Sequence, residues 1–187
     1  MNITREDAFV WLNEEIKEPN LVKHCLAAEV AMKYLAVHFG EDENVWGLTG
    51  LLHDIDYETT KDNPAEHSLK GYQMLSGKGI ENDIAEAVKT HNDAHGIPPA
   101  TLMAKAIYCV DSLTGLVVAT TLVLPSRKIQ EVQVDNVLRR FKEKGFARGV
   151  NRINILKCEE LLNLSLQEFV EITLKAMQSI SGELGLA

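Results

Sequence analysis

The feature that most constrains the fold is a long apolar run over residues 101–124. A run of this length exceeds an ordinary strand and predicts a buried helix. Its most membrane-like part, residues 113–124, is too short to span a bilayer and is interrupted by threonines. Between residues 106 and 118, Asp111 is the only charged residue. A carboxylate in such surroundings needs a compensating partner, and a metal ion is a good one.

The rest of the chain also predicts helix, and it carries no strand pattern. Asn63-Pro64-Ala65-Glu66 is a strong helix-start signal, and Ser165 to Glu168 forms a capping box. The sequence therefore predicts an all-α bundle of about eight to nine helices in one domain, 1–187. Thr4 begins a capping pattern with Asp7, and a first amphipathic helix opens over residues 8–12. We expect the other helices over 20–40, 43–53, 64–77, 82–91, 136–144, 151–163 and 165–179, with Asp135 as a cap.

The most informative motif for function is His53-Asp54, which ends the apolar helical stretch 45–52. Imidazole nitrogen together with carboxylate oxygen suits borderline divalent metals. A bound metal would also offset the cost of taking the carboxylate out of water. We therefore predict that both side chains hold one cation.

Other histidines lie along the chain in a suggestive order. His24 lies in a long amphipathic segment, His67 follows the Asn63-Pro64 signal, and His91 ends a helical run. The order His24, His53-Asp54, His67, His91, Asp111 resembles the HD-domain superfamily of metal-dependent phosphohydrolases over about residues 20–125. Residues 126–187 would be a helical C-terminal extension.

The resemblance implies a fold and a set of ligands. It implies an HD-domain helical bundle in which His24, His53, Asp54 and Asp111 hold a first metal ion. His67 and His91 match the additional histidines of dinuclear relatives, and Asp54 could bridge two ions. The resemblance also makes His53 and Asp54 the catalytic pair. We expect one or two divalent ions, with Mn, Fe, Co, Mg and Ni left open.

The chain departs from the better-known family pattern just after the His-Asp pair. Many relatives read His-Asp-Ile-Gly-Lys, whose lysine can contact phosphate, whereas Asp56 and Tyr57 stand at those positions here. Lys61 or an arginine further along could replace that lysine, and His95 could lie near the substrate. The signature of cyclic-di-GMP phosphodiesterases is missing, because Asn92 follows His91.

Charge is unevenly distributed along the chain. The net charge is −8, which argues against general nucleic-acid binding. Residues 127–157 nevertheless carry nine Lys or Arg and only three Asp or Glu. This segment could bind a phosphorylated ligand or be a solvated helix face. We expect Arg127, Arg148 and Arg152 to contact phosphate, because guanidinium pairs with phosphate in a forked geometry.

These features predict metal-assisted hydrolysis of a phosphoester or phosphoanhydride in a small phosphorylated substrate, expected to be a nucleotide. Two alternatives stay open. A mixed-valence iron pair could use the same ligands to activate oxygen and cleave a carbon bond. The domain could also be a non-catalytic module that senses a metal or a nucleotide.

Location and assembly are less constrained. The charged N-terminus lacks the apolar run of a signal peptide, so we expect a cytoplasmic protein with no membrane partner. Cys25, Cys109 and Cys158 have no metal-like spacing and are expected to be buried reduced thiols. The apolar segment 166–180 could be core or the face of a homodimer.

Overall fold

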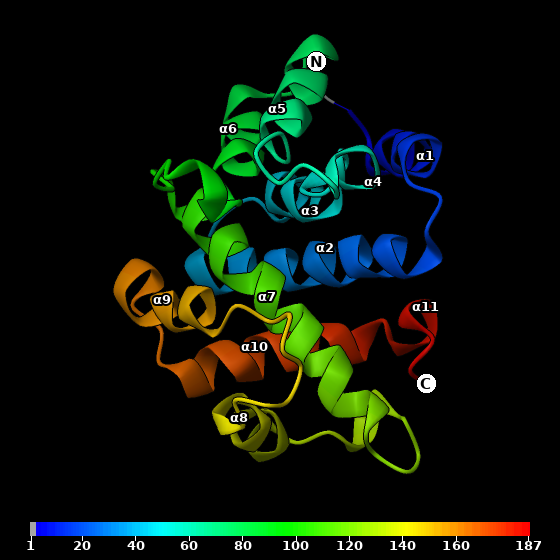
Figure 1. Cartoon of the computed structure of the whole chain (residues 1–187), viewed down its shortest axis with the longest axis vertical. Coiled ribbons are helices and arrows are strands. Elements are labelled where there is room, and N and C mark those ends of the chain that lie inside the picture. Colours follow the sequence, from blue (N-terminus) through cyan, green and yellow to red (C-terminus); the bar gives the residue numbers. More distant parts are fainter. Residues whose placement is uncertain (1–2) are drawn as a thin grey trace.

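The computed structural model describes residues 3–187, and over this range the chain is built of helices without strands (Figure 1). Met1 and Asn2, which form part of the N-terminal export argument, lie outside the described residues. The prediction of an all-α fold is confirmed. The α-helices are α1 (Arg5–Glu15), α2 (Pro19–Phe39), α3 (Glu43–Leu52), α4 (Tyr57–Thr60), α5 (Leu69–Gly77), α6 (Asn82–Thr90), α7 (Leu102–Leu122), α8 (Val134–Lys142), α9 (Arg152–Leu162), α10 (Leu166–Ser179) and α11 (Ser181–Leu184), with 3-10 turns η1 (Asp93–His95) and η2 (Ile129–Glu131).

Two long helices organise the bundle. In Figure 1, α2 runs across the middle of the molecule and α7 crosses it diagonally. Helices α1, α3, α5 and α6 lie on one side of α2, and α8 and α10 lie on the other. The C-terminal helices pack onto this frame, because α9 contacts α7 and α10 contacts both α2 and α7. The α2–α7 crossing is therefore the centre of the fold.

The apolar run identified in the sequence forms α7. This helix is long and apolar enough to cross a membrane by length and composition, but 56% of its most hydropathic window is buried inside the protein. Its buried positions include Ile107, Val110, Leu113 and Val117, one or two turns apart. The helix therefore behaves as a core element against which the others pack.

Helix α3 lies very close to α2, and Gly50 allows it. A Cβ at Gly50 would be 2.5 Å from the carbonyl oxygen of Ala28, a distance that real Cβ atoms do not tolerate. The missing side chain lets the two helix backbones approach. His53 is the C-cap of α3, three residues after Gly50, so this approach also decides how near it comes to α2.

The start of α5 differs from the sequence prediction. The Asn63-Pro64 signal predicts a helix from residue 64, but the chain forms turns there and α5 begins at Leu69. Tertiary contacts override the local signal, because the buried Asp56 carboxylate accepts the backbone N–H groups of Ser68 and Gly71. Ser68 takes a positive φ of 69°, which breaks the helical path before Leu69.

Other termini follow the sequence more closely. Thr4 caps α1 by accepting from the backbone N–H of Asp7. Ser165 and Glu168 form the predicted capping box of α10. The cap of α8 is Gln133 and not Asp135, so that prediction was wrong by two residues; Asp135 lies in the first turn instead. The three cysteines are free and buried, as predicted.

Candidate metal centre

The six predicted metal ligands meet in one cluster although they come from distant parts of the sequence. They are placed by five helices or by residues at the ends of those helices. His24 lies on α2, His53 caps the C-terminus of α3, Asp54 follows it, His67 precedes α5, His91 caps the C-terminus of α6, and Asp111 lies in the middle of α7.

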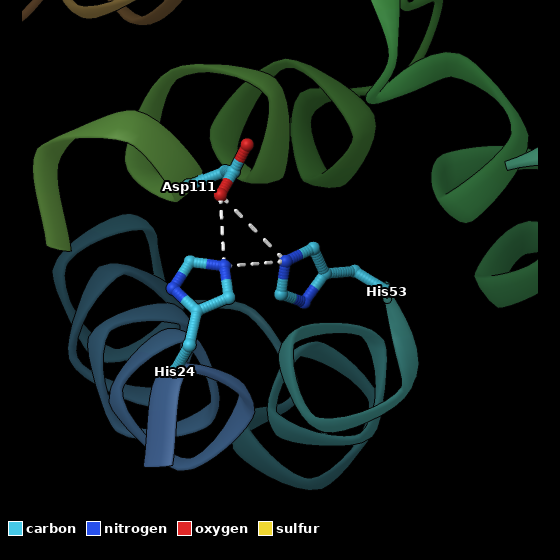
Figure 2. A group of neighbouring side chains, drawn as sticks. All are labelled: His24, His53 and Asp111. Carbon is cyan, nitrogen blue, oxygen red and sulfur yellow. Dashed lines mark hydrogen bonds and ion pairs between the residues drawn. The ribbon is translucent and has the colours of Figure 1, made fainter. Parts of the chain in front are cut away.

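The first half of the cluster joins α2, α3 and α7 (Figure 2). The Nε2 atom of His24 lies 3.1 Å from Nε2 of His53 and 3.0 Å from Oδ1 of Asp111. Nε2 of His53 lies 3.7 Å from the same carboxylate oxygen. Three ligand atoms of the right type thus surround one point, as a single divalent ion requires.

The second half joins the loop before α5 to the end of α6. Nε2 of His67 and Nε2 of His91 lie 3.2 Å apart. Oδ1 of Asp54 lies 3.3 Å from the former and 3.4 Å from the latter. The other oxygen of Asp54, Oδ2, lies 3.5 Å from Nε2 of both His24 and His53. Asp54 therefore stands between the two halves with one oxygen directed at each.

The opposite nitrogen of each histidine is held by a partner. Nδ1 of His53 lies 2.8 Å from the carbonyl oxygen of Gly50, and Nδ1 of His91 lies 2.6 Å from that of Val88. A carbonyl can only accept, so both Nδ1 atoms carry the proton when the ring is neutral. The Nε2 lone pairs of His53 and His91 are then free to bind a metal.

Thr114 performs the same task for His24. Its hydroxyl donates to the carbonyl of Asp111 at 2.7 Å and lies 3.3 Å from Nδ1 of His24. Because the hydroxyl proton is already used, the oxygen can accept the Nδ1 proton of His24. Thr114 was not among the residues predicted from the sequence. Its position three residues after Asp111, in the next turn of α7, is the signal that could have suggested it.

Asp56 holds His67, a role that was not predicted from the sequence. It is fully buried, and its Oδ1 lies 3.0 Å from Nδ1 of His67. Its Oδ2 accepts from the backbone N–H groups of Ser68 at 2.8 Å and Gly71 at 2.9 Å. Asp56 thus orients the imidazole and shapes the chain around it. A third carboxylate two residues after the His-Asp pair was the available signal.

The ionisable groups of the cluster shift the pKa values of one another. Burial acts to lower the pKa of His53, but Asp54 and Asp111 outweigh it and raise the pKa to about 9. At His67, burial also acts to lower the pKa, but Asp54 and Asp56 outweigh it and raise the pKa to about 10. The histidines in turn lower the pKa of Asp54 well below its usual range, against the effect of burial. The pocket favours positive charge opposite its carboxylates.

The donor set fits a divalent metal. Among the described residues, the ion-pair partners of Asp54 and Asp111 are histidines, with no Lys or Arg. The buried Glu29 offers a contrast, because Arg5 and Lys33 neutralise it. Four imidazole nitrogens and two carboxylates without a fixed cation provide what one or two metal ions need.

The cluster opens to solvent on one side. The side chains of His24 and Asp111 are 24% and 32% exposed, whereas His53 and His91 are buried. Solvent therefore reaches the cluster from the His24–Asp111 side.

The predicted substrate contacts are scattered. His95 lies in η1 and donates from Nε2 to the carbonyl of His67, so it supports the loop of a candidate ligand. Lys61 is exposed and lines a separate groove with Lys17 and Tyr57. Tyr57 packs its ring edge-on against His67, with centroids 5.1 Å apart.

The predicted arginine contacts are not brought to the cluster by any contact in the described chain. Arg127 and Arg148 are exposed. Arg152 is committed elsewhere, because every guanidinium nitrogen donates to backbone carbonyls in the segment 140–150, including that of Phe146 at 2.6 Å. Arg152 therefore holds the backbone of residues 140–150 in place and has no guanidinium nitrogen left without a backbone partner.

Comparison with known proteins gives two matches. The model of the HD domain family matches residues 21–116, which is more than half of the chain and includes all six clustered residues. Ribonuclease Y from Protochlamydia amoebophila (strain UWE25) is 24% identical over 96 residues, or 51% of this chain. The aligned part spans only 18% of that protein's length.

Proposed function

Because the chain belongs to the HD domain family, we propose that it is a hydrolase that uses divalent metal to cleave a phosphoester or phosphoanhydride bond. The family is one of metal-dependent phosphohydrolases, and the His/Asp cluster fits the metal site that such a reaction needs. The proposal goes beyond the family in naming the bond, the ligands and the substrate class.

The observation that carries the proposal is the position of Asp54 between two pairs of imidazole nitrogens. Each of its oxygens lies 3.3–3.5 Å from two Nε2 atoms. A carboxylate shared in this way suits two neighbouring cations, as in hydrolytic sites with paired metals. In this assignment His24, His53 and Asp111 complete the first site, and His67 and His91 complete the second.

The residues of the cluster would then have different roles in binding metal and substrate. When bound to these residues, divalent metal would supply charge neutralisation on phosphate oxygens and acidification of water. His53 and His91, both buried, fix the inner wall through their backbone-bonded Nδ1 atoms. Asp54 keeps the two sites in register, and Asp111, partly exposed, faces the entry side where the phosphate arrives.

The finer substrate assignment is a small nucleotide. One support is the arrangement of His67, Thr90-His91 and Val110-Asp111, which resembles that of small dinuclear HD proteins that cleave nucleotides. The other is the similarity to a protein named Ribonuclease Y. The same ligands could serve a di-iron oxygenase or a metal-dependent sensing module. Iron content with oxygen uptake would favour the oxygenase, and stable metal binding without turnover would favour the module.

Metal analysis of a ligand variant tests the proposal. We expect His24→Ala to lose metal and phosphoester turnover together, because Nε2 of His24 lies within 3.5 Å of ligand atoms of His53, Asp54 and Asp111. His38→Ala is the matched control, since His38 is exposed near the other end of the same helix. Wild-type turnover in His24→Ala would contradict the assignment.

A further inference from the structure

A cleft of about 440 Å³ opens beside the candidate metal centre. It lies between α2, α7 and residues 184–186, and His24 forms part of its wall. Figure 1 shows the C-terminal residues beside α11, near the beginning of α2. His24 is also one of the two more exposed members of the cluster. The cleft therefore adjoins the cluster through His24, and its size is within the range of small-ligand sites.

The lining of this cleft is mainly aliphatic. Apart from the His24 imidazole, none of the described residues that line it has an aromatic side chain. Transfer of a flexible alkyl group from water into this cleft would be favourable, because apolar surface would be buried. A nucleobase would have no large aromatic ring to stack on among the described lining residues. The aliphatic residues are Ala27 of α2, Val118, Ala119 and Leu122 of α7, and Leu184 and Leu186 near the C-terminus.

Lys23 supplies the positive charge of the cleft. It immediately precedes His24, and its ammonium group lies above Gly185, 2.9 Å from where a Cβ of that residue would be. Lys23 is half-buried, and no described carboxylate lies within ion-pair distance of it. An unpaired ammonium next to a candidate metal ligand is suited to a phosphate oxygen.

We propose that this cleft binds the organic part of the substrate, and that the substrate is a phosphoester of an aliphatic alcohol. The phosphate would face the cluster with one oxygen at Lys23, and the alkyl chain would lie along α7 toward Leu122. The proposal rests on the proposed function for the reaction at the cluster. The sequence-based expectation of a nucleotide would place a nucleoside in the cleft, whereas this proposal places an alkyl chain there.

Calorimetric binding of alkylphosphonates to the metal-loaded protein under anaerobic conditions tests the cleft without turnover. Methylphosphonate, hexylphosphonate and adenosine 5′-monophosphate are the probes. We expect affinity to rise from the methyl to the hexyl compound, by up to about fourfold for each methylene that becomes fully buried. Tighter binding of adenosine 5′-monophosphate than of hexylphosphonate would overturn the proposal.

Two variants locate the effect. Gly115 lines the cleft, and a Cβ there would meet only Val150, at 3.8 Å, so Gly115→Leu adds a large side chain at the cleft wall without a backbone clash. We expect it to remove the advantage of the hexyl over the methyl compound. Gly77→Leu is the control, because Gly77 is also helical and has open space around it. Lys23→Met should lower the affinity for methylphosphonate and for hexylphosphonate by a similar factor.

The results separate this inference from the function on which it rests. An unchanged hexyl advantage in Gly115→Leu, with metal content retained, would refute the cleft assignment whatever the enzyme hydrolyses. If phosphonates bind as expected but neither alkyl phosphates nor nucleotides are hydrolysed, the proposed reaction fails and the binding site remains. Hydrolysis of nucleotides alone would support the reaction and reject the aliphatic substrate.

Discussion

Replacing Asp56 by asparagine should weaken one half of the metal centre and spare the other. The Asp56 carboxylate makes three hydrogen bonds, one to Nδ1 of His67 at 3.0 Å and two to backbone N–H groups at 2.8 and 2.9 Å. An amide has only one oxygen. If that oxygen keeps the backbone N–H groups, the NH₂ group faces Nδ1 and favours the His67 tautomer with its proton on Nε2, where it blocks metal binding.

The expected magnitude follows from this geometry. Removing the partner that orients a ligating histidine typically lowers metal affinity about 10- to 100-fold. The loss should fall on the site of His67 and His91, because His24 and His53 have their own Nδ1 partners in Thr114 and Gly50. The first site should therefore stay filled at metal concentrations that leave the second site empty.

Metal stoichiometry in equilibrium with a chelating buffer is the direct assay for Asp56→Asn. At matched free metal we expect two ions per chain in the wild type and one in the variant, with unchanged helical circular dichroism. Asp62→Asn makes the same chemical change at an exposed loop position and serves as the control. Equal loss from both sites, or wild-type affinity at both, would refute the separate role assigned to Asp56.

Three further predictions concern stability. In chelator-treated protein the pKa values of His53 (about 9) and His67 (about 10) exceed the ordinary 6.5. The stability that these protonated histidines contribute is fully present below pH 6.5 and is lost as pH rises from there through 9–10. Tm should fall between pH 6.5 and 10, and a constant Tm would contradict the attraction of these histidines to the carboxylates. Arg152→Ala should lower the free energy of unfolding by about 2–3 kcal/mol in urea titrations, because its charged hydrogen bonds to carbonyls are lost; metal content should not change, and a variant of wild-type stability would remove its assigned role. Gly50→Ala should cost about 1–3 kcal/mol by forcing a Cβ against the carbonyl of Ala28; an unaffected Tm would show that α2 and α3 can separate freely.

Much of the local structure was predictable because helices are specified by nearby residues. The apolar run over 101–124 gave α7 to within two residues at each end, and the Ser165 capping box gave the start of α10. Capping and i, i+3 or i, i+4 patterns act within one or two turns, so they can be identified without knowledge of the fold. The Asn63-Pro64 signal failed because Asp56, several residues earlier, binds the backbone that the signal would have made helical.

The sequence by itself determined which residues could bind a metal, because imidazole and carboxylate chemistry is a property of the residue type. It placed His24, His53-Asp54 and Asp111 on separate helices in the order typical of the family. Only the tertiary structure decided how these groups face each other. The direction of the two Asp54 oxygens, the hydrogen bond of Asp56 to His67 and the cleft beside His24 depend on contacts between residues far apart in the chain. Such contacts are set by the packing of α2, α3 and α7, and packing depends on the whole core at once.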